Sequence, residues 1–482
     1  MQFNSYIFVL LLLPVSVVGY FALNKITHTA GLVFLTLVSG AFYLYGGLEG
    51  TLILAASMLI NYLFSYLVSK NLRYKTAIFV AGILINAFLL LYFKYYNFLV
   101  ENLSQHFQLN LVTKQLLLPL GISFYTFQLV AWLVESYRGN TQQYSFLDYL
   151  LYTLYFPKLI MGPITGPQEL ISQFHNPELK KPDSEQLMAG LQMFAFGMFK
   201  KVILADTFAK AVAWGFANES TATSGDLLIV MLAYTFQIYF DFSGYSDMAL
   251  GVSKMLNIQL AMNFDSPYQA MSIRDFWKRW HMSLTQFLTK YIYFPLGGSR
   301  KGEARTYLNT MLVFLFSGIW HGANWTFLLW GFLHGALSVL ERIFHKQYQK
   351  LHPGFQWLST FVCTNVLWLL FTSPSIQQWL SMLGKILSFQ DMRITGALLR
   401  SVNMAEFDLL FRVLNVNSIT SQVRGLSMLI LMVFSFLLCL CATNNVRREK
   451  RPTASNMVLC LVALTWSILS LSGESTFLYF GF

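Results

Sequence analysis

Residues 316–325 read Phe-Ser-Gly-Ile-Trp-His-Gly-Ala-Asn-Trp and lie within an apolar stretch that extends from Leu312 to Leu340. This stretch is long enough to cross a lipid bilayer, because a spanning helix needs about 20 residues. His321 is unusual there, since a charged side chain at the bilayer centre costs about 2.5–3.5 kcal/mol on insertion scales. Because the full apolar run 306–340 is too long for one crossing, we expect a helical hairpin or a bent, re-entrant element.

The composition is that of a membrane protein. Of the 482 residues, 55% are hydrophobic and only 11% are charged, whereas soluble domains carry about 25% charged residues. We expect an all-α polytopic membrane protein that forms one domain over residues 1–482, with about 11–13 membrane-embedded helices. The apolar runs lie near residues 6–23, 30–47, 50–68, 76–99, 115–136, 147–163, 187–213, 226–252, 306–340, 355–373, 424–442 and 456–472.

The positions of basic residues predict the orientation of the chain in the membrane. Lysine and arginine gather in cytoplasmic loops, and segment 271–305 carries the strongest concentration, with further basic loops at 70–75, 342–350 and 447–451. Counting crossings from these loops places both termini outside the cytoplasm. Residues 374–423 then form an extracytoplasmic element, with an amphipathic helix near 376–388.

Missing sequence patterns exclude several function classes. The chain has no G-x-x-x-x-G-K-[ST] phosphate loop, no G-x-S-x-G nucleophile elbow and no H-E-x-x-H zinc motif, which identify P-loop ATPases, α/β-hydrolases and zinc peptidases. No basic face on a soluble domain is visible, which argues against nucleic-acid binding. We expect neither a bound metal nor a bound cofactor.

The segment around His281 combines cations with aromatic residues. Residues 272–281 read Ser-Ile-Arg-Asp-Phe-Trp-Lys-Arg-Trp-His, and the first serine predicts the N-cap of a helix that runs through His281. On that helix Trp277 and His281 are neighbours at the i,i+4 spacing. The segment has two interpretations: an anchor at the membrane surface, or a site that attracts an anionic, phosphate-bearing cosubstrate past His281. The cations concerned are Arg274, Lys278 and Arg279.

His321 also has two interpretations. Its imidazole is either bonded to a backbone carbonyl at a helix crossing or is a general base, because burial favours the neutral form that accepts a proton. Gly318 and Gly322 flank His321 and have no side chains, so a substrate or another helix can approach closely there. Asn324 is placed to orient a bound group. We expect His334 on the far side of a straight helix from His321.

A third polar feature lies in the apolar run 226–252. Tyr234, Gln237, Asp241 and Tyr245 are spaced by three or four residues and share one helical face. An aspartate in an apolar helix must face protein or water. We favour a structural polar network around Asp241, and the alternative is a role of Asp241 and Gln237 in substrate binding or catalysis.

Several motifs together resemble the membrane-bound O-acyltransferase family, in its bacterial alginate O-acetyltransferase branch. The resemblance covers about residues 30–345 and the C-terminal end. Each motif alone is weak, and the combination is specific. The motifs are LPLGISFYTF at 118–127, YFPKLIMGPI at 155–164, FDFSGYSD at 240–247, FWKRWH at 276–281, SGIWHG at 317–322 and the terminal FLYFGF at 477–482.

The resemblance implies a ring of helices around a tunnel that joins the two sides of the bilayer, with a catalytic portion at about 115–345. It implies His321 as the catalytic histidine and His281 as the second histidine of the family. The family moves acyl groups from a cytoplasmic thioester, such as acetyl-CoA or an acyl carrier, to a hydroxyl. The bacterial branch resides in the inner membrane and passes acyl groups to surface polysaccharides, often through a separate extracytoplasmic acyltransferase of the SGNH type.

These observations predict a membrane O-acetyltransferase that modifies an exported or cell-surface polysaccharide. An acyl thioester is already activated, so the enzyme must supply only a base and stabilisation of the oxyanion, for which Asn324 and backbone amides are candidates. The alternatives within the class are peptidoglycan O-acetylation and teichoic-acid D-alanylation. A proton-coupled transporter is the rival from another class, because intramembrane His and Asp also form proton relays. The internal repeats expected of a transporter are absent from the sequence.

Overall fold

A computed structural model of the chain describes residues 1–70, 73–402, 404, 413, 420–442, 444–447, 453–471, 477 and 478. These residues form helices and connecting loops without a β-strand, which confirms the all-α class. Within this described part, five helical segments are long and apolar enough to cross a membrane. They are Leu48–Ser69, Lys75–Phe107, Ser184–Ala217, Ser224–Met255 and Pro353–Thr372.

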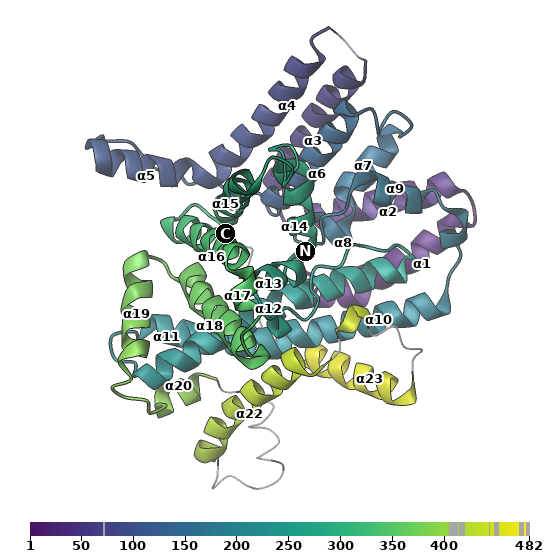
Figure 1. The fold of residues 1–482 in the computed structure, drawn as a ribbon. Helices are drawn as coiled ribbons and strands as arrows, with labels where there is room; N and C mark the ends of the chain where they lie inside the picture. The colour runs from purple at the N-terminus through teal and green to yellow at the C-terminus, as the bar shows by residue number, and fades with distance from the viewer. Residues whose placement is uncertain are drawn as a thin grey trace.

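The N-terminal part consists of consecutive apolar helices and ends in a projecting arm. Helix α5 extends away from the body of the molecule, and a loop returns from it to α6 (Figure 1). A π-helical segment, η2, joins α4 to α5 and faces the end of a later helix. The elements are η1 (Phe8–Leu12), α1 (Leu13–Asn24), α2 (His28–Leu44), α3 (Leu48–Ser69), α4 (Lys75–Leu90), η2 (Leu91–Tyr95), α5 (Tyr96–Phe107) and α6 (Ile122–Tyr137).

The long helix α12 lies at the centre of the middle part and is buried along most of its length. It packs on α10 through two pairs of facing glycines. A Cβ on Gly190 would lie 2.6 Å from Gly251 O, and one on Gly197 would lie 2.7 Å from Gly244 O, so only glycine permits this approach. The elements are α7 (Phe146–Leu154), α8 (Phe156–Leu159), α9 (Pro167–Phe174), η3 (Pro177–Lys180), α10 (Ser184–Met198), η4 (Phe199–Ala205), α11 (Asp206–Ala217) and α12 (Ser224–Met255).

Two apolar runs do not form the predicted spans. The run 147–163 is interrupted where α7 ends at Leu154, and only the single turn of α8 follows. Every residue from Tyr155 to Thr165 is buried, so the apolar character of this run serves the protein core rather than contact with lipid. In the run 115–136, the chain is a loop as far as Gly121, whose φ of 72° precedes the start of α6.

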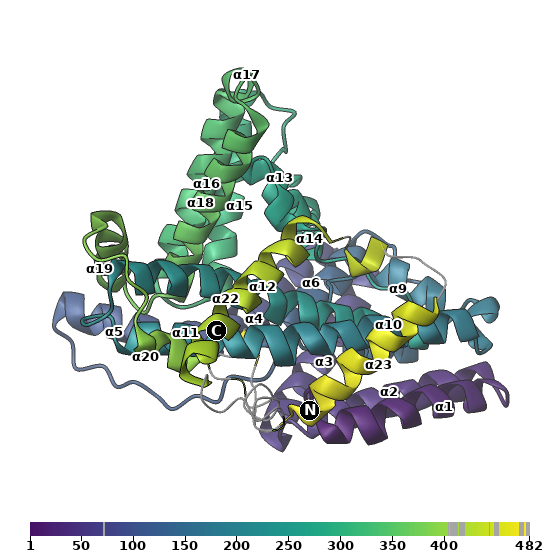
Figure 2. The same ribbon diagram turned by 90° about the horizontal axis from the view of Figure 1, so that it is seen from below.

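The run 306–340 forms a helical hairpin, which is one of the two arrangements that its length predicts. Helices α15 and α16 are antiparallel, and α18 stands beside them (Figure 2). A Cβ on Gly318 would lie 2.4 Å from Phe327 O, and one on Gly331 would lie 2.4 Å from Phe314 O, so both glycines are required by the close packing. The elements are η5 (Pro267–Gln269), α13 (Ile273–Arg279), α14 (Met282–Leu288), η6 (Thr289–Tyr293), α15 (Glu303–His321), α16 (Trp325–Ile343), α17 (His345–Tyr348) and α18 (Pro353–Thr372).

The predicted amphipathic helix near 376–388 is confirmed as α19 (Ile376–Ser388). Met382 and Ile386 face the protein, whereas Leu380 and Leu387 are exposed. Residues 403, 405–412 and 414–419 of the predicted extracytoplasmic element lie outside the described residues. The remaining elements are α20 (Gly396–Ser401), α22 (Thr420–Leu440), η8 (Asn445–Arg447) and α23 (Ala454–Leu469).

Helices from all parts of the chain surround the short helices α13 and α14. In Figure 1, α3 and α6 lie on one side of α14, α10 and α12 lie on the other, and the α15–α16 hairpin closes the circle. This arrangement agrees with the ring of helices that the resemblance implies. It places the segments that carry His281 and His321 in the interior, where both side chains are buried.

Candidate active site

His321 lies at the C-terminal end of α15, where the hairpin turns. Gly322 adopts an extended conformation (φ −171°, ψ 160°) that ends the helix. Asn324 begins α16 as its N-cap, because its side chain accepts a hydrogen bond from Thr326 N–H at 3.1 Å. The Asn324 amide group also donates to Pro374 O at 2.9 Å. Both polar groups of Asn324 therefore shape the turn, and the structure gives this residue a capping role.

Aromatic side chains surround the imidazole of His321. The side chain is buried, and its ring meets Trp320, Trp330 and Phe371 edge-on, at centroid distances of 4.9, 5.2 and 5.2 Å. These neighbours belong to α15, α16 and α18, so the ring lies where three helices meet. Edge-on aromatic contacts of this kind fix the orientation of a ring in an apolar environment.

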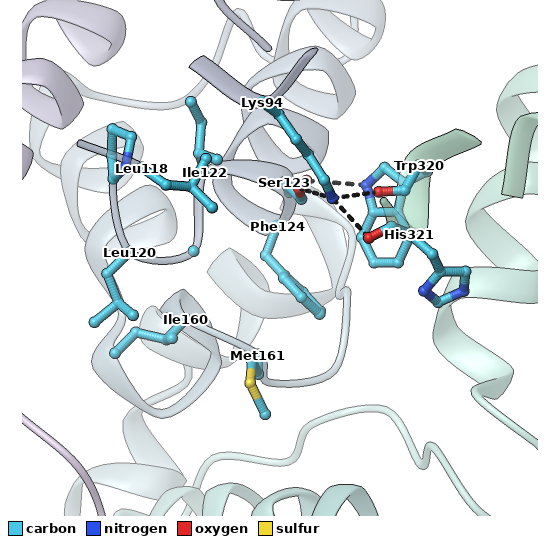
Figure 3. Close-up of a pocket in the computed structure, with 12 residues that line it drawn as sticks. Lys94, Leu118, Leu120, Ile122, Ser123, Phe124, Ile160, Met161, Trp320 and His321 are labelled. Atoms are coloured by element: carbon cyan, nitrogen blue, oxygen red, sulfur yellow. Dashed lines mark hydrogen bonds between the residues drawn. The ribbon is translucent and has the colours of Figure 1, made fainter. Parts of the chain in front are cut away.

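A small pocket borders His321, with a cavity volume of about 50 Å³. One wall is the loop Leu118–Gly121 before α6, and the opposite wall is the end of α15. The His321 ring points away from this loop, whereas its carbonyl group faces Lys94 (Figure 3). The backbone of His321 therefore borders the small pocket, and its ring packs among the aromatic side chains on the other side. The lining, which we call the small pocket, includes Lys94, Leu120, Ser123, Ile160, Trp320 and His321.

Two residues of η2 cap the carbonyl groups at the end of α15. Lys94 Nζ donates to Trp320 O at 2.6 Å and to His321 O at 2.9 Å. The Tyr95 hydroxyl donates to Ile319 O. No role is predicted for Lys94 from the sequence, because 76–99 is predicted only as an apolar membrane span. The available signal was a lysine inside an apolar run, which requires a polar partner.

His281 is buried near the same tryptophan, but it does not lie on the predicted helix. Helix α13 ends at Arg279, and His281 adopts φ 45° and ψ 51°, in the left-handed region, before α14 begins. The helix through His281 and its i,i+4 contact with Trp277 are therefore wrong. The His281 ring lies 4.7 Å from the Phe242 ring and 6.2 Å from the Trp320 ring. Among the described residues, neither ring nitrogen of His281 has a hydrogen-bond partner.

Hydrogen bonds to a distant segment explain the break before His281. Asp265 N–H donates to Arg279 O at 2.9 Å, and Met282 N–H donates to Asn263 O at 3.0 Å. These bonds use backbone groups that a continuous helix would pair within itself. The predicted N-cap is nevertheless confirmed, because Ser272 Oγ accepts a hydrogen bond from Asp275 N–H at 3.1 Å.

A larger pocket of about 260 Å³, which we call the basic pocket, lies between α13, α14, α15 and α16. Arg274 and Lys278 of α13 line it together with Arg342 of α16, so three cations surround one cavity. Arg279, the third cation predicted here, is instead paired with Asp275, its Nε lying 2.9 Å from Oδ1. The apolar walls include Trp277, Leu284, Leu288, Val313 and Phe314.

His334 lies next to the site, contrary to the prediction that it lies on the far side. The prediction assumed one straight helix, and the hairpin instead folds α16 back along α15. The Trp330 ring lies 5.2 Å from the His321 ring and 4.8 Å from the His334 ring. The Trp277 Nε1–H group donates to His334 Nδ1 at 3.2 Å. His334 therefore connects the basic pocket to the surroundings of His321.

Asp241 of α12 lies in a buried ion pair. Lys201 Nζ donates to Asp241 Oδ1 at 2.7 Å and to Asp206 Oδ1 at 2.8 Å, and Leu478 N–H donates to Asp241 Oδ2 at 3.0 Å. These contacts agree with the favoured structural network. Within the described part of the chain, neither Asp241 nor Gln237 lines the small pocket or the basic pocket.

Helix α15 forms a wall of both pockets. Val313, Phe314 and Ser317 line the basic pocket, and Trp320 and His321, about one turn further on, line the small pocket. His321 itself lines the small pocket, whereas the basic pocket reaches α15 only as far as Ser317, about one turn before His321. For the residues that the structure describes, no group of three or more His, Cys, Asp or Glu side chains could hold a metal ion.

Comparisons with known proteins give matches along the whole chain. The model of the membrane-bound O-acyltransferase family matches residues 41–383, which include both pockets. A peptidoglycan O-acetyltransferase of Helicobacter pylori is 33% identical, over 100% of this chain and 97% of the relative. A probable alginate O-acetylase of Pseudomonas putida is 32% identical over the full length of both chains. A teichoic acid D-alanyltransferase of Bacillus subtilis is 26% identical, over 77% of this chain and 94% of the relative.

Proposed function

The chain belongs to the membrane-bound O-acyltransferase family, and we propose that it transfers an acetyl group from a cytoplasmic thioester toward hydroxyl groups of an exported or cell-surface polysaccharide. The match to the family over residues 41–383 confirms the resemblance seen in the motifs. The full-length relatives are acyltransferases by name, and this chain is an acyltransferase. The family assignment excludes the alternative prediction that the chain is a proton-coupled transporter.

One observation carries the proposal: His321 lies where a cationic pocket and a second pocket share one helix. The basic pocket ends on α15 at Ser317, and the small pocket begins on the same helix at Trp320. The reaction transfers an acyl group from a charged donor on one side of the membrane to an alcohol on the other side. A histidine at the end of the helix that these two pockets share is suited to such a reaction.

We assign the proton transfers to His321. The hydroxyl oxygen of the acceptor attacks the thioester carbonyl carbon while its proton passes to a nitrogen of the imidazole. The carbon–sulfur bond then breaks, the ester carbonyl forms, and the proton passes from His321 to the departing thiolate, which leaves as a thiol. Histidine suits both transfers because one ring nitrogen can accept a proton in the first step and release it in the second. His281, whose buried ring lacks a hydrogen-bond partner among the described residues, is proposed to orient the reacting groups.

The basic pocket is proposed to receive the donor as a cosubstrate. Its cations suit the phosphate groups of acetyl-CoA or of the phosphopantetheine arm of an acyl carrier. The apolar wall around Trp277 and Phe314 suits the uncharged part of such an arm. Because the basic segment 271–305 marks the cytoplasmic side, the donor enters from the cytoplasm. The pocket cations are Arg274, Lys278 and Arg342.

The acceptor side is proposed to be extracytoplasmic. The full-length relatives are named for the acetylation of two surface glycans, peptidoglycan and alginate. We place the chain in a bacterial inner membrane, with both termini extracytoplasmic and a separate SGNH-type acyltransferase completing the transfer to the polymer. Peptidoglycan is the second candidate acceptor, because the Helicobacter pylori relative aligns with the whole of this chain.

Mass spectrometry of envelope glycans from cells with and without this chain tests the proposal. We expect O-acetyl groups on an exported polysaccharide or on peptidoglycan to disappear when the chain is removed. Loss of D-alanyl esters from teichoic acid, with O-acetyl groups unchanged, would replace acetyl by D-alanyl as the transferred group. Unchanged acylation of every glycan would contradict the proposal.

A further inference from the structure

Lys94 is a cation inside the apolar segment Lys75–Phe107, and its neighbours are polar atoms without negative charge. Its Nζ lies 2.6 Å from Trp320 O, 2.9 Å from His321 O and 3.3 Å from Ser123 Oγ. Three oxygen acceptors match the three N–H donors of a protonated lysine. Among the described residues, no carboxylate forms an ion pair with Lys94.

The carbonyl groups that Lys94 contacts are the negative end of α15. The peptide dipoles of a helix leave a partial negative charge at its C-terminus, which attracts protons and cations. His321 is the last residue of α15. This end of the helix favours an imidazolium, which cannot accept the proton of an attacking hydroxyl, and so opposes the burial that favours the neutral ring. The ammonium group opposes that effect, because a nearby positive charge disfavours a second one.

Hydrogen bonding alone does not account for a lysine at this position. Tyr95, the next residue, caps Ile319 O with an uncharged hydroxyl. A neutral donor is therefore sufficient to satisfy a carbonyl at this helix end. What Lys94 adds is charge, in an apolar environment where charge interactions are stronger than in water. The π-helical segment η2, a distortion often found at functional sites, brings Lys94 to this point.

We infer that Lys94 is a positioning residue for the proposed acyl transfer, and that its positive charge keeps His321 able to accept a proton at neutral pH. The inference rests on the proposed function, since it concerns the same reaction. The titratable groups that face His321 within the described residues are Lys94 of η2, His281 between α13 and α14, and His334 of α16.

The test compares four variants of the full-length chain in membranes supplied with radiolabelled acetyl-CoA. Lys94→Met removes the charge, and Lys94→Arg keeps it. Lys114→Met is the matched control, because Lys114 is an exposed lysine of the loop that follows the same helical arm. His321→Ala reports whether the labelling depends on the proposed function at all. The readout is label that mild base releases from polymeric material, measured from acidic to alkaline pH, together with the thermal unfolding of each variant.

We expect Lys94→Met to move the acidic limb of the pH–rate profile upward by about one pH unit, which lowers activity about tenfold on that limb. Activity should recover at alkaline pH, and Lys94→Arg and Lys114→Met should resemble wild type. A wild-type profile for Lys94→Met would overturn the inference. A pH-independent loss in Lys94→Met would also overturn it, because that result indicates a structural role alone. Full labelling with His321→Ala would instead contradict the proposed function.

Discussion

The indole N–H of Trp277 donates to His334 Nδ1 at 3.2 Å. This bond joins α13, which carries two cations of the basic pocket, to the hairpin that carries His321. Trp277 is itself a wall of that pocket, and His334 contacts the Trp330 ring that also packs on His321. Helix α16 thus holds one wall of the proposed donor pocket through His334 and contacts the proposed base through Trp330.

Replacing His334 by alanine should weaken donor binding more than it slows chemistry. The Trp277 N–H group would lose its partner, at a cost of about 1 kcal/mol, and the Michaelis constant for acetyl-CoA should rise roughly fivefold. Steady-state kinetics of His334→Ala, Trp277→Phe and the double variant measure this, with His106→Ala as the control at an exposed histidine. The two changes should not be additive. A fall in kcat at constant Michaelis constant would place His334 with the base instead.

The cations of the basic pocket should contribute to donor affinity individually. Arg274→Ala, Lys278→Ala and Arg342→Ala should each raise the Michaelis constant for acetyl-CoA several-fold, and added salt should weaken wild-type binding by screening. Arg279→Ala is the matched control, because Arg279 pairs with Asp275 outside the pocket. If Arg279→Ala had the same effect as the other three, general surface charge rather than the pocket would explain donor binding.

The close packing of the hairpin predicts a sharp difference between two glycines. In Gly318→Ala, the new methyl group would lie 2.4 Å from Phe327 O, so α15 and α16 must separate. We expect a loss of about 1–3 kcal/mol in the free energy of unfolding, together with reduced activity. Gly384→Ala in α19 meets no atom within 4 Å and should be neutral or stabilising. Thermal unfolding in detergent measures both variants, and equal melting temperatures would contradict the packing described here.

Glu135, at the end of α6, should be a structural centre rather than a catalytic group. Its side chain is 2% exposed and accepts hydrogen bonds from α9, from η6 and from the turn that follows α6. We expect Glu135→Ala to lower the free energy of unfolding by about 1–2 kcal/mol, because it removes a buried acceptor that joins several segments, while the freed donors are exposed or partly exposed to water. Thermal unfolding checks this, and an unchanged melting temperature would contradict it. The donors are Arg138 Nη1, Asn140 Nδ2, Gln168 Nε2, Lys290 Nζ and the Tyr291 hydroxyl.

Features that depend on local pattern could be predicted from the sequence. The length of the run 306–340 indicates a hairpin or a bent element, and the pattern of residues 376–388 indicates the amphipathic α19. The N-cap at Ser272 and the buried position of His321 belong to the same class. Each depends on residues within a few turns of one another, where hydropathy and capping preferences act directly.

Features that depend on distant contacts could not be predicted. The capping of α15 by Lys94 joins residues 226 positions apart, and the break at His281 depends on hydrogen bonds to residues 263–265. Hydropathy also cannot distinguish core from lipid contact, so the run 147–163 predicts a span, whereas its second half lies in the buried segment Tyr155–Thr165. His334 was misplaced because its position requires the fold of the hairpin rather than the spacing along one helix.

The most direct measurement is the O-acetyl content of envelope glycans in cells that express His321→Ala at the wild-type level in the membrane. The account predicts that O-acetylation falls to the level of cells that lack the chain, while the variant unfolds at the same temperature as the wild type. Undiminished O-acetylation by His321→Ala would contradict the assignment of His321 as the base, and with it the proposed path of the acetyl group.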